Sequence, residues 1–597
     1  MRPMALAALV NKDYAEKAKA DGFPAVVHYS REALRADKDK AWVRTRQQLI
    51  EILDTRGVGI YSELAFDFLP GFDRIYVNAL EIYDSSMKWK AKIPLSGAYI
   101  TYATELGQSN EMQTAHFPLE KLSPGDFIFV QVSRTSVANY GVIPFVSFEA
   151  SEEVPVQKTS FKIYADTARF VTEEYGPLST RYDADGEEWT IDDPVVKRHE
   201  PYMPVYRDYG AGFELTGKRT WQDVGREYEN LIRHQFKNSI PVREKAFEVK
   251  GSRLGEEAIL AEVRYVRENI RYRDVRFGGH SLIPQLAETT LRERRGDCKD
   301  QSLLLKEMLA AIGVPSKLVA IHLSEAGFET LPSIQQFNHM MLYIPKGDKH
   351  PEMWVDPSDK GGNDRPIPLD MEGKVALVID AESSYVAVTP VLENEKEHQV
   401  FLGHRLHISA DGTAEFRDSL CMTGKFASVL RNQLYGKDAK EMEVLIQDLI
   451  AQRIPDVSIS RVRAENVADF NKPLKLVITF ASKNYFGKSS DGVRGRYPNV
   501  WERSIMHLPK VRTRYLPIRM PHETEFESTL DVSADGSLEV SEAPRFSRET
   551  EYVNFEKTDG GYKWMTFAIY ADPSEYERIR EEWNYLLDAT SPEIVVK

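Results

Sequence analysis

The chain of 597 residues has little cysteine, no long apolar run and no concentration of basic residues. Its two cysteines, Cys298 and Cys421, are too few and too far apart for a disulfide framework or a CxxC zinc or redox site. No apolar stretch approaches about 18 residues, so we expect no membrane-spanning helix. The formal net charge of −14, without a dense Lys/Arg run, argues against nucleic-acid binding. A content of 42% hydrophobic residues is ordinary for globular protein.

The first ten residues form a short apolar segment with one positive charge, but this segment lacks a clean small-residue cleavage site. The polar run Asn11-Lys12-Asp13 follows at once. A secretory signal normally has a longer apolar region and such a cleavage site. We therefore interpret this segment as a poor signal peptide or the remnant of one, and the sequence leaves the localisation unknown.

The N-terminal part, residues 20–195, has the pattern of β-strands. Phe72 to Asp84 mixes apolar and polar residues in near alternation, and Phe127 to Val132 follows a turn at Ser123 to Asp126. Asp183 to Gly186 is a further hairpin-like turn. Strand-like runs separated by Gly/Pro turns are typical of a β-sandwich or an antiparallel sheet. We predict a β-sandwich-like domain here.

From residue 200 to 392 the apolar period changes to that of helices. Thr220 to Phe236 has an N-cap residue at its start, and Ile259 to Ile270 repeats at helical spacing. A helix over Asp297 to Ile312 is then followed by strand-like runs at Lys317 to Leu323 and Phe337 to Ile344. Helices followed by strands predict an α+β domain.

The last part, residues 395–597, returns to β character. Leu474 to Phe480 is a clear strand, and one amphipathic helix, Lys437 to Ile454, interrupts the strands. The sequence thus predicts three domains, with a mostly β domain at the C-terminal end.

Cys298 lies at the start of a predicted helix, with Asp297 as its N-cap. The free backbone N–H groups and the dipole of the helix favour a negative charge on the sulfur, which makes a cysteine more reactive. Because Asp297 and Lys299 flank the thiol, we do not expect it to be buried in an apolar core. Cys421, within a strand-like run, is interpreted as structural.

His339 and Asp356 are the candidate partners of the thiol. Taken alone, His339 is more simply interpreted as a structural histidine of a strand, and Asp356 as a turn aspartate before proline. A helix N-terminus followed by two strands can, however, bring thiol, imidazole and carboxylate into one line. The histidine would then take the thiol proton and the carboxylate would orient the histidine. The three residues together predict a catalytic triad of Cys298, His339 and Asp356.

The motifs around these residues resemble those of a known family. Gly296 to Asp300 before a leucine-rich helix, Phe337 to His339, and Trp354 to Pro357 are similar to the transglutaminase-like core of many bacterial proteins. Val266 to Tyr272 also resembles that core, and residues 20 to 190 resemble the β-rich domain of unknown function that commonly precedes it. The resemblance implies a papain-like geometry and thiol-dependent acyl transfer on amides. It also favours an extracytoplasmic location.

The resemblance further implies an oxyanion hole, for which the Cys298 backbone N–H is one donor. Tyr272 is our candidate for the second donor, although a packed core tyrosine is the simpler interpretation, and His280 and Gln285 are weaker candidates. With water as the simplest acceptor, we expect a peptidase or amidase rather than a cross-linking enzyme, acting on a protein or peptide. No cofactor or metal is expected.

A non-catalytic binding or scaffold protein that retains a transglutaminase-like core is the alternative function. Two flanking β domains would suit a large recognition surface, whereas an intact triad argues against loss of catalysis. Use of Cys298 and His339 as metal ligands is a third possibility, which the lack of a second nearby cysteine disfavours. The substrate and the oligomeric state cannot be inferred from the sequence.

Overall fold

The computed structural model describes residues 6–597 except 37–40, 69, 71–72, 103–112, 137–142, 274–281, 325–326, 360–363, 393–397, 470, 484, 491, 506–511, 521–522, 542–547 and 559. The chain divides into two compact units. The first comprises residues 1–198, 205–359 and 366–391, and the second comprises 199–204, 360–365 and 392–597. The first unit therefore holds both the predicted N-terminal domain and the predicted α+β domain.

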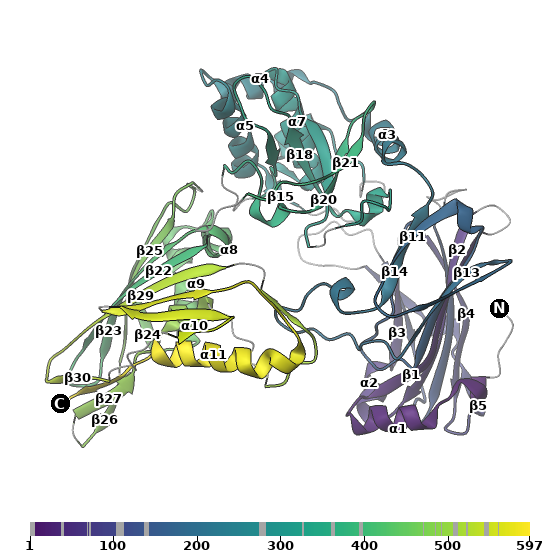
Figure 1. The fold of residues 1–597 in the computed structure, drawn as a ribbon, viewed down its shortest axis with the longest axis horizontal. Coiled ribbons are helices and arrows are strands. Elements are labelled where there is room, and N and C mark those ends of the chain that lie inside the picture. The colour runs from purple at the N-terminus through teal and green to yellow at the C-terminus, as the bar shows by residue number, and fades with distance from the viewer. Residues whose placement is uncertain are drawn as a thin grey trace. The chain divides into compact units, whose positions relative to one another are not determined.

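The N-terminal β region is built on an eight-stranded sheet of order β12-β13-β10-β1-β2-β8-β4-β5. Two three-stranded sheets, β11-β14-β9 and β3-β7-β6, accompany it (Figure 1). Its strands are β1 Ala25–Ala36, β2 Trp42–Ile52, β3 Glu63–Phe68, β4 Asp73–Tyr83, β5 Trp89–Lys92, β6 Tyr99–Tyr102, β7 Gln113–Pro118, β8 Phe127–Ser136, β9 Val146–Glu149, β10 Lys158–Tyr164, β11 Phe170–Tyr175, β12 Ser179–Asp183, β13 Gly186–Asp192 and β14 Gly212–Gly217, with the helices α1 Lys12–Ala20 and α2 Thr55–Ile60.

Packed aromatic rings join the layers of this β region, as in a sandwich. Phe161 on β10 meets Phe213 on β14 edge to face, with 5.1 Å between ring centroids, and Trp189 on β13 stacks on Phe213 at 4.2 Å. All three side chains are fully buried. The large sheet is mixed rather than purely antiparallel, because β1 and β10 pair in parallel. Strand β14 also pairs with β9 and β11, so this β region continues beyond the predicted boundary near residue 200.

The α+β region has a five-stranded sheet of order β19-β18-β17-β20-β21. Helix α7 packs against β18, and α4, α5 and α6 pack against α7 (Figure 1). The elements of this region are α3 Trp221–Ile232, α4 Ile240–Lys250, α5 Glu256–Asn269, β15 Arg271–Tyr272, α6 Ala287–Glu293, β16 Arg295–Gly296, α7 Cys298–Ala311, β17 Lys317–Ile321, β18 His339–Ile344, β19 Met353–Val355, β20 Val375–Ile379 and β21 Tyr385–Val388.

The second unit carries another eight-stranded sheet, of order β24-β25-β23-β22-β29-β33-β32-β31. A four-stranded sheet, β26-β27-β35-β30, and a pair, β28-β34, complete its β structure. Its elements are β22 Gln399–Ile408, β23 Ala414–Met422, α8 Gly424–Leu434, α9 Ala439–Ala451, β24 Val457–Glu465, β25 Leu474–Ser482, β26 Gly487–Ser489, β27 Gly492–Arg496, α10 Val500–Ile505, β28 Ile518–Met520, β29 Thr524–Ala534, β30 Leu538–Val540, β31 Arg548–Glu549, β32 Val553–Thr558, β33 Gly561–Thr566, β34 Ile569–Ala571, α11 Tyr576–Ala589 and β35 Glu593–Val596.

The predicted fold class is confirmed: the N-terminal and C-terminal parts of the chain are β-rich, and the part between them in sequence is a helical core. The second unit nevertheless has more helix than the single one predicted, because α8, α10 and α11 accompany α9. Helix α11 buries Tyr576, Ile579, Trp583 and Leu586 at helical spacing, a pattern that the sequence also contains. None of the described helices is long and apolar enough to cross a membrane.

Candidate active site

Helix α7 begins at Cys298 because Asp297 caps it. The Asp297 carboxylate accepts hydrogen bonds from the backbone N–H groups of Lys299 and Asp300, and the Asp300 side chain accepts one from the Asp297 N–H. This reciprocal pair is a capping box, which satisfies donors that the first helical turn leaves free. As the first residue of the helix, Cys298 has a backbone N–H that no carbonyl of the helix can accept.

Cys298 is buried, contrary to the expectation from its charged neighbours. Only 6% of the residue is exposed, and it belongs to the apolar cluster of the α+β region. The flanking charges do not keep the thiol in solvent because they pair with each other, the Lys299 ammonium lying 2.5 Å from the Asp297 carboxylate. The thiol therefore lies in an apolar environment at the N-terminus of a helix.

His339 is the first residue of β18, and this strand lies against α7. The Ser302 hydroxyl of α7 donates to the backbone carbonyl of Met340 over 3.1 Å, which ties the helix to the strand beside the histidine. His339 is buried, and its Nε2 lies 2.7 Å from Asp356 Oδ2. The side chain of Cys298 interacts with the same ring and contributes to raising the pKa of His339. The structure thus brings the thiol, the imidazole and the carboxylate together.

Asp356 directly follows β19 and is held at both its side chain and its backbone. The backbone N–H and the hydroxyl of Ser358 donate to Asp356 Oδ1 over 2.8 and 2.7 Å. The Arg267 Nε–H of α5 donates to the Asp356 backbone carbonyl over 2.9 Å. Because Oδ1 is held by Ser358, Oδ2 is left to face His339.

Burial by itself would lower the pKa of His339, but the adjacent Asp356 charge and hydrogen bonds to Asp356 and Cys298 raise it to about 10. Burial would likewise raise the pKa of Asp356, yet the charge of His339 and hydrogen bonds from His339 and Ser358 lower it to about 2. Both shifts favour an imidazolium next to a carboxylate.

Tyr272, the predicted oxyanion donor, lies in the short strand β15. This strand pairs in parallel with β16, and Tyr272 is aligned with Gly296, two positions before Cys298. Tyr272 is 47% exposed, so it is not the packed core tyrosine of the simpler interpretation. Gln285 is engaged elsewhere, since its side chain donates to the Arg295 carbonyl. His280 lies outside the described residues.

Tyr228 on α3 is a second hydroxyl that sequence reasoning missed. Only 3% of the residue is exposed, and its hydroxyl has no hydrogen-bond partner in the described part of the chain. It belongs to the same apolar cluster as Cys298, and burial, followed by the charges of Cys298 and Asp297, raises its pKa. The sequence shows Tyr228 only as one apolar position of a helix, between Val224 and Ile232.

Cys421, interpreted as structural, lies in β23 and is half-buried, and both cysteines are free. Over the described ranges there is no group of three or more His, Cys, Asp or Glu side chains that could hold a metal ion.

The chemistry that Cys298, His339 and Asp356 can offer is nucleophilic attack by sulfur with proton transfer through the imidazole.

Comparison with known proteins identifies two domains in the chain. Residues 243–348 match the transglutaminase-like superfamily, and residues 38–193 match a domain of unknown function with a solved structure, DUF3857. The chain therefore contains a transglutaminase-like domain preceded by a β-rich DUF3857 domain. A comparison with curated proteins gives no match.

Among solved structures, the chain is similar to a “putative protease” from Parabacteroides distasonis ATCC 8503. The TM-score is 0.62 at 13% identity, over 96% of this chain and 99% of that chain. An M1 zinc metallopeptidase from Deinococcus radiodurans matches at 9% identity and a TM-score of 0.17, over 32% of this chain and 42% of that chain. A “putative cysteine protease” from Cytophaga hutchinsonii matches at 11% identity and 0.15, over 53% and 75%. Of these three matches, the first covers nearly the whole length of both chains.

Proposed function

We propose that the protein is a thiol enzyme that cleaves amide bonds by acyl transfer, with Cys298 as nucleophile, His339 as general base and acid, and Asp356 as the group that orients His339. The observation that carries this proposal is the position of His339. One ring nitrogen faces a buried carboxylate at 2.7 Å, and Cys298 at the start of α7 contributes to the raised pKa of the same ring. This leaves His339 Nδ1 as the atom that exchanges a proton with sulfur.

The first half of the reaction forms a thioester. In the resting state Cys298 has given its proton to His339 Nδ1, in agreement with the raised pKa of His339, and the sulfur attacks the carbonyl carbon of the amide. Negative charge develops on the carbonyl oxygen, for which the Cys298 backbone N–H is one donor. The C–N bond then breaks as His339 returns the proton to the leaving amine. Asp356 stabilises the imidazolium throughout and keeps Nε2 protonated.

The second half transfers the acyl group to water. His339 Nδ1 takes a proton from a water molecule, whose oxygen attacks the thioester carbon. The C–S bond breaks, and the sulfur leaves as a thiolate beside the protonated His339. Transfer to an amine would need a binding site for that amine, whereas hydrolysis needs none, so hydrolysis is the simpler outcome. The similarity in fold to a “putative protease” agrees with a protein or peptide substrate.

The second oxyanion donor is a tyrosine hydroxyl in this scheme. Tyr272 lies on the strand beside Gly296, and Tyr228 lies in the apolar cluster of Cys298. Tyr228 is the better supported of the two, because its hydroxyl is buried and has no hydrogen-bond partner among the described residues. A buried donor without a partner costs stability unless a ligand satisfies it.

A peptide library incubated with the full-length protein tests this function, with new amino termini identified by mass spectrometry. We expect cleavage by the unaltered protein and by Cys421→Ala, and none by Cys298→Ala. The two variants make the same change at the only two cysteines of the chain. Cleavage that persists in Cys298→Ala would refute the proposal. Products joined by new amide bonds would instead identify an amine as the acceptor.

A further inference from the structure

The large sheet of the second unit has a polar hollow on its outer face. The hollow has a volume of about 560 Å³ and lies over β22, β23, β25 and β29. Gly403 forms part of its lining, and a Cβ atom there would lie 2.6 Å from the Ser419 hydroxyl. The missing side chain therefore helps to keep the hollow open. We call this hollow the arginine pocket, and its lining includes Gly403, Arg405, Arg417, Ser419, Thr529 and Asp531.

Two arginines lie side by side in the lining of the arginine pocket. Arg405 on β22 is directly opposite Arg417 on β23, and both are exposed. Arg461 on β24 extends the row, since it and Arg417 are both aligned with Thr479 of β25. Like charges directly opposite each other in a sheet are destabilising. Over the described ranges, none of these three guanidinium groups lies within ion-pair distance of a carboxylate. The nearest acidic neighbour in the register is Asp531 on β29, which is aligned with Arg405.

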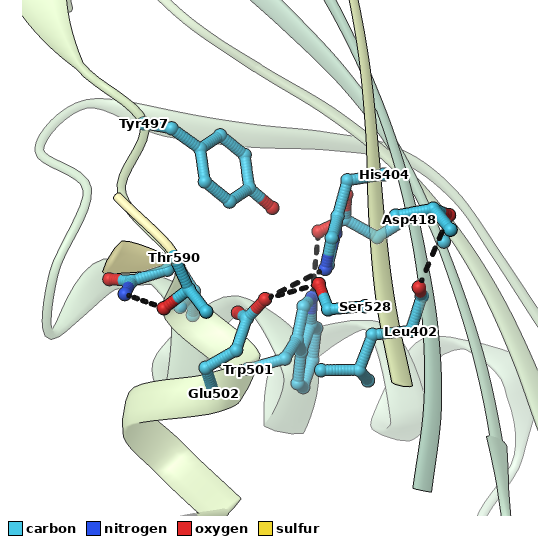
Figure 2. Close-up of polar contacts among 12 residues, drawn as sticks. Leu402, His404, Asp418, Tyr497, Trp501, Glu502, Ser528 and Thr590 are labelled. Carbon is cyan, nitrogen blue, oxygen red and sulfur yellow. Dashed lines mark hydrogen bonds and ion pairs between the residues drawn. The ribbon is translucent and has the colours of Figure 1, made fainter. Parts of the chain in front are cut away.

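The opposite face of the same strands is fixed by a buried polar network (Figure 2). His404 Nδ1 lies 2.9 Å from Asp418 Oδ1, and the Trp501 indole N–H donates to Asp418 Oδ2 over 2.7 Å. The Ser528 hydroxyl donates to Glu502 over 2.8 Å, and the same Glu502 oxygen lies 3.3 Å from His404 Nε2. The network therefore joins β22, β23, β29 and α10.

This buried network is too enclosed to be a site of its own, since the side chains of His404, Asp418 and Glu502 are at most 2% exposed. Its effect reaches the outer face through strand geometry. Successive side chains of a strand point to opposite faces, so fixing His404 and Asp418 also fixes their neighbours Arg405 and Arg417. The two guanidinium groups are thus carried on a rigid part of the sheet.

We propose that the arginine pocket binds a ligand through an oxyanion, a carboxylate or a phosphate, held between Arg405 and Arg417. The guanidinium fork matches both groups in two parallel hydrogen bonds. The hydroxyls of Ser419 and Thr529 already donate to the carbonyls of Gly403 and Leu402, so they offer acceptor lone pairs to the ligand. The ligand therefore combines an anionic group with hydroxyl or amide donors, and the volume suits a small molecule. This site is independent of the proposed catalysis.

Calorimetric titration of the full-length protein with citrate and, separately, with inorganic phosphate tests this proposal. We expect saturable binding of at least one anion and a loss of affinity of about tenfold or more in Arg417→Gln, since one bidentate partner is removed. Binding of citrate alone would assign a carboxylate ligand, and binding of phosphate alone a phosphate ligand. Arg463→Gln is the control, because it makes the same change in charge on β24 at a residue that pairs with Glu465.

The melting temperature without added anion gives a second, independent readout. Arg417→Gln relieves the repulsion with Arg405, so it should raise the melting temperature, whereas Arg463→Gln should not. The absence of saturable binding to either anion would overturn the proposal. An equal loss of affinity in Arg417→Gln and Arg463→Gln would also overturn it, because binding would then follow net charge rather than the pocket.

Discussion

The Nε2–H of His339 donates to the Asp356 carboxylate over 2.7 Å, and both side chains are buried. This bond fixes which nitrogen of the ring is available to the thiol. It also explains why the two pKa values move apart, with His339 raised to about 10 and Asp356 lowered to about 2. Under the proposed function, this relationship makes the carboxylate a participant in the chemistry at Cys298.

Replacing Asp356 by Asn should lower turnover by about 10²–10⁴-fold, because the imidazolium loses its charged partner and the ring can adopt the wrong tautomer. The measurement is the rate of peptide cleavage at substrate saturation. Asp380→Asn is the matched control, since Asp380 pairs with Lys317 in the same region. Equal rates for Asp356→Asn and Asp380→Asn would show that Asp356 does not orient the histidine.

The His339–Asp356 pair should make stability depend on pH in two directions. The pKa of His339 is raised to about 10, so its stabilisation is complete below its ordinary value of about 6.5 and is lost as pH rises through 10. The pKa of Asp356 is lowered to about 2, so its stabilisation is complete above about 4 and is lost as pH falls through 2. The pair therefore contributes most between about pH 4 and 6.5.

Thermal unfolding at pH 6 and pH 9.5 checks this dependence. The unaltered protein should unfold at a lower temperature at pH 9.5, and His339→Gln should reduce that difference. His404 also has a pKa raised to about 10, because the charges of Asp418 and Glu502 outweigh the effect of burial. Its contribution is retained in His339→Gln, so some pH dependence should remain. A difference that His339→Gln leaves unchanged would argue against the ion pair.

Removing the cap of α7 should affect both stability and activity. Asp297→Ala should cost about 1 kcal/mol of stability through the lost N-cap and reduce cleavage, since Cys298 is the next residue. Asp438→Ala removes an equivalent capping box from α9, a helix of the second unit that does not carry Cys298. Denaturant unfolding and cleavage rates measured on both variants separate the two effects. Full activity in Asp297→Ala would mean that the cap does not position the thiol.

The two tyrosines near Cys298 can be distinguished by removing one oxygen from each. Tyr228→Phe should lower turnover by about 10²–10³-fold if its hydroxyl stabilises the oxyanion, and it should leave stability equal or higher because an unpartnered buried hydroxyl is removed. Tyr272→Phe, at a half-exposed residue, should have a smaller effect. A large loss in Tyr272→Phe with full activity in Tyr228→Phe would reverse this assignment.

Much of the secondary structure around the site could be predicted from the sequence. The cap at Asp297 and the apolar spacing after it indicate the start of α7, and runs of apolar residues indicate β17 and β18. The burial of Cys298 could not be predicted, because it depends on the pairing of Asp297 with Lys299. Tyr228 was missed for a related reason, since its proximity to the thiol arises from the packing of α3, 70 residues earlier in the chain.

The central claim is that His339 activates Cys298, and the pH dependence of alkylation tests it most directly. Iodoacetamide should be applied to the Cys421→Ala protein, in which Cys298 is the only thiol, with and without His339→Ala. We predict that Cys298 is alkylated faster at pH 6 when His339 is present than when it is absent, because the imidazole accepts the thiol proton, and that the two rates converge as pH rises. Equal rates in both proteins at pH 6, or no alkylation of Cys298 in the folded protein, would contradict the claim.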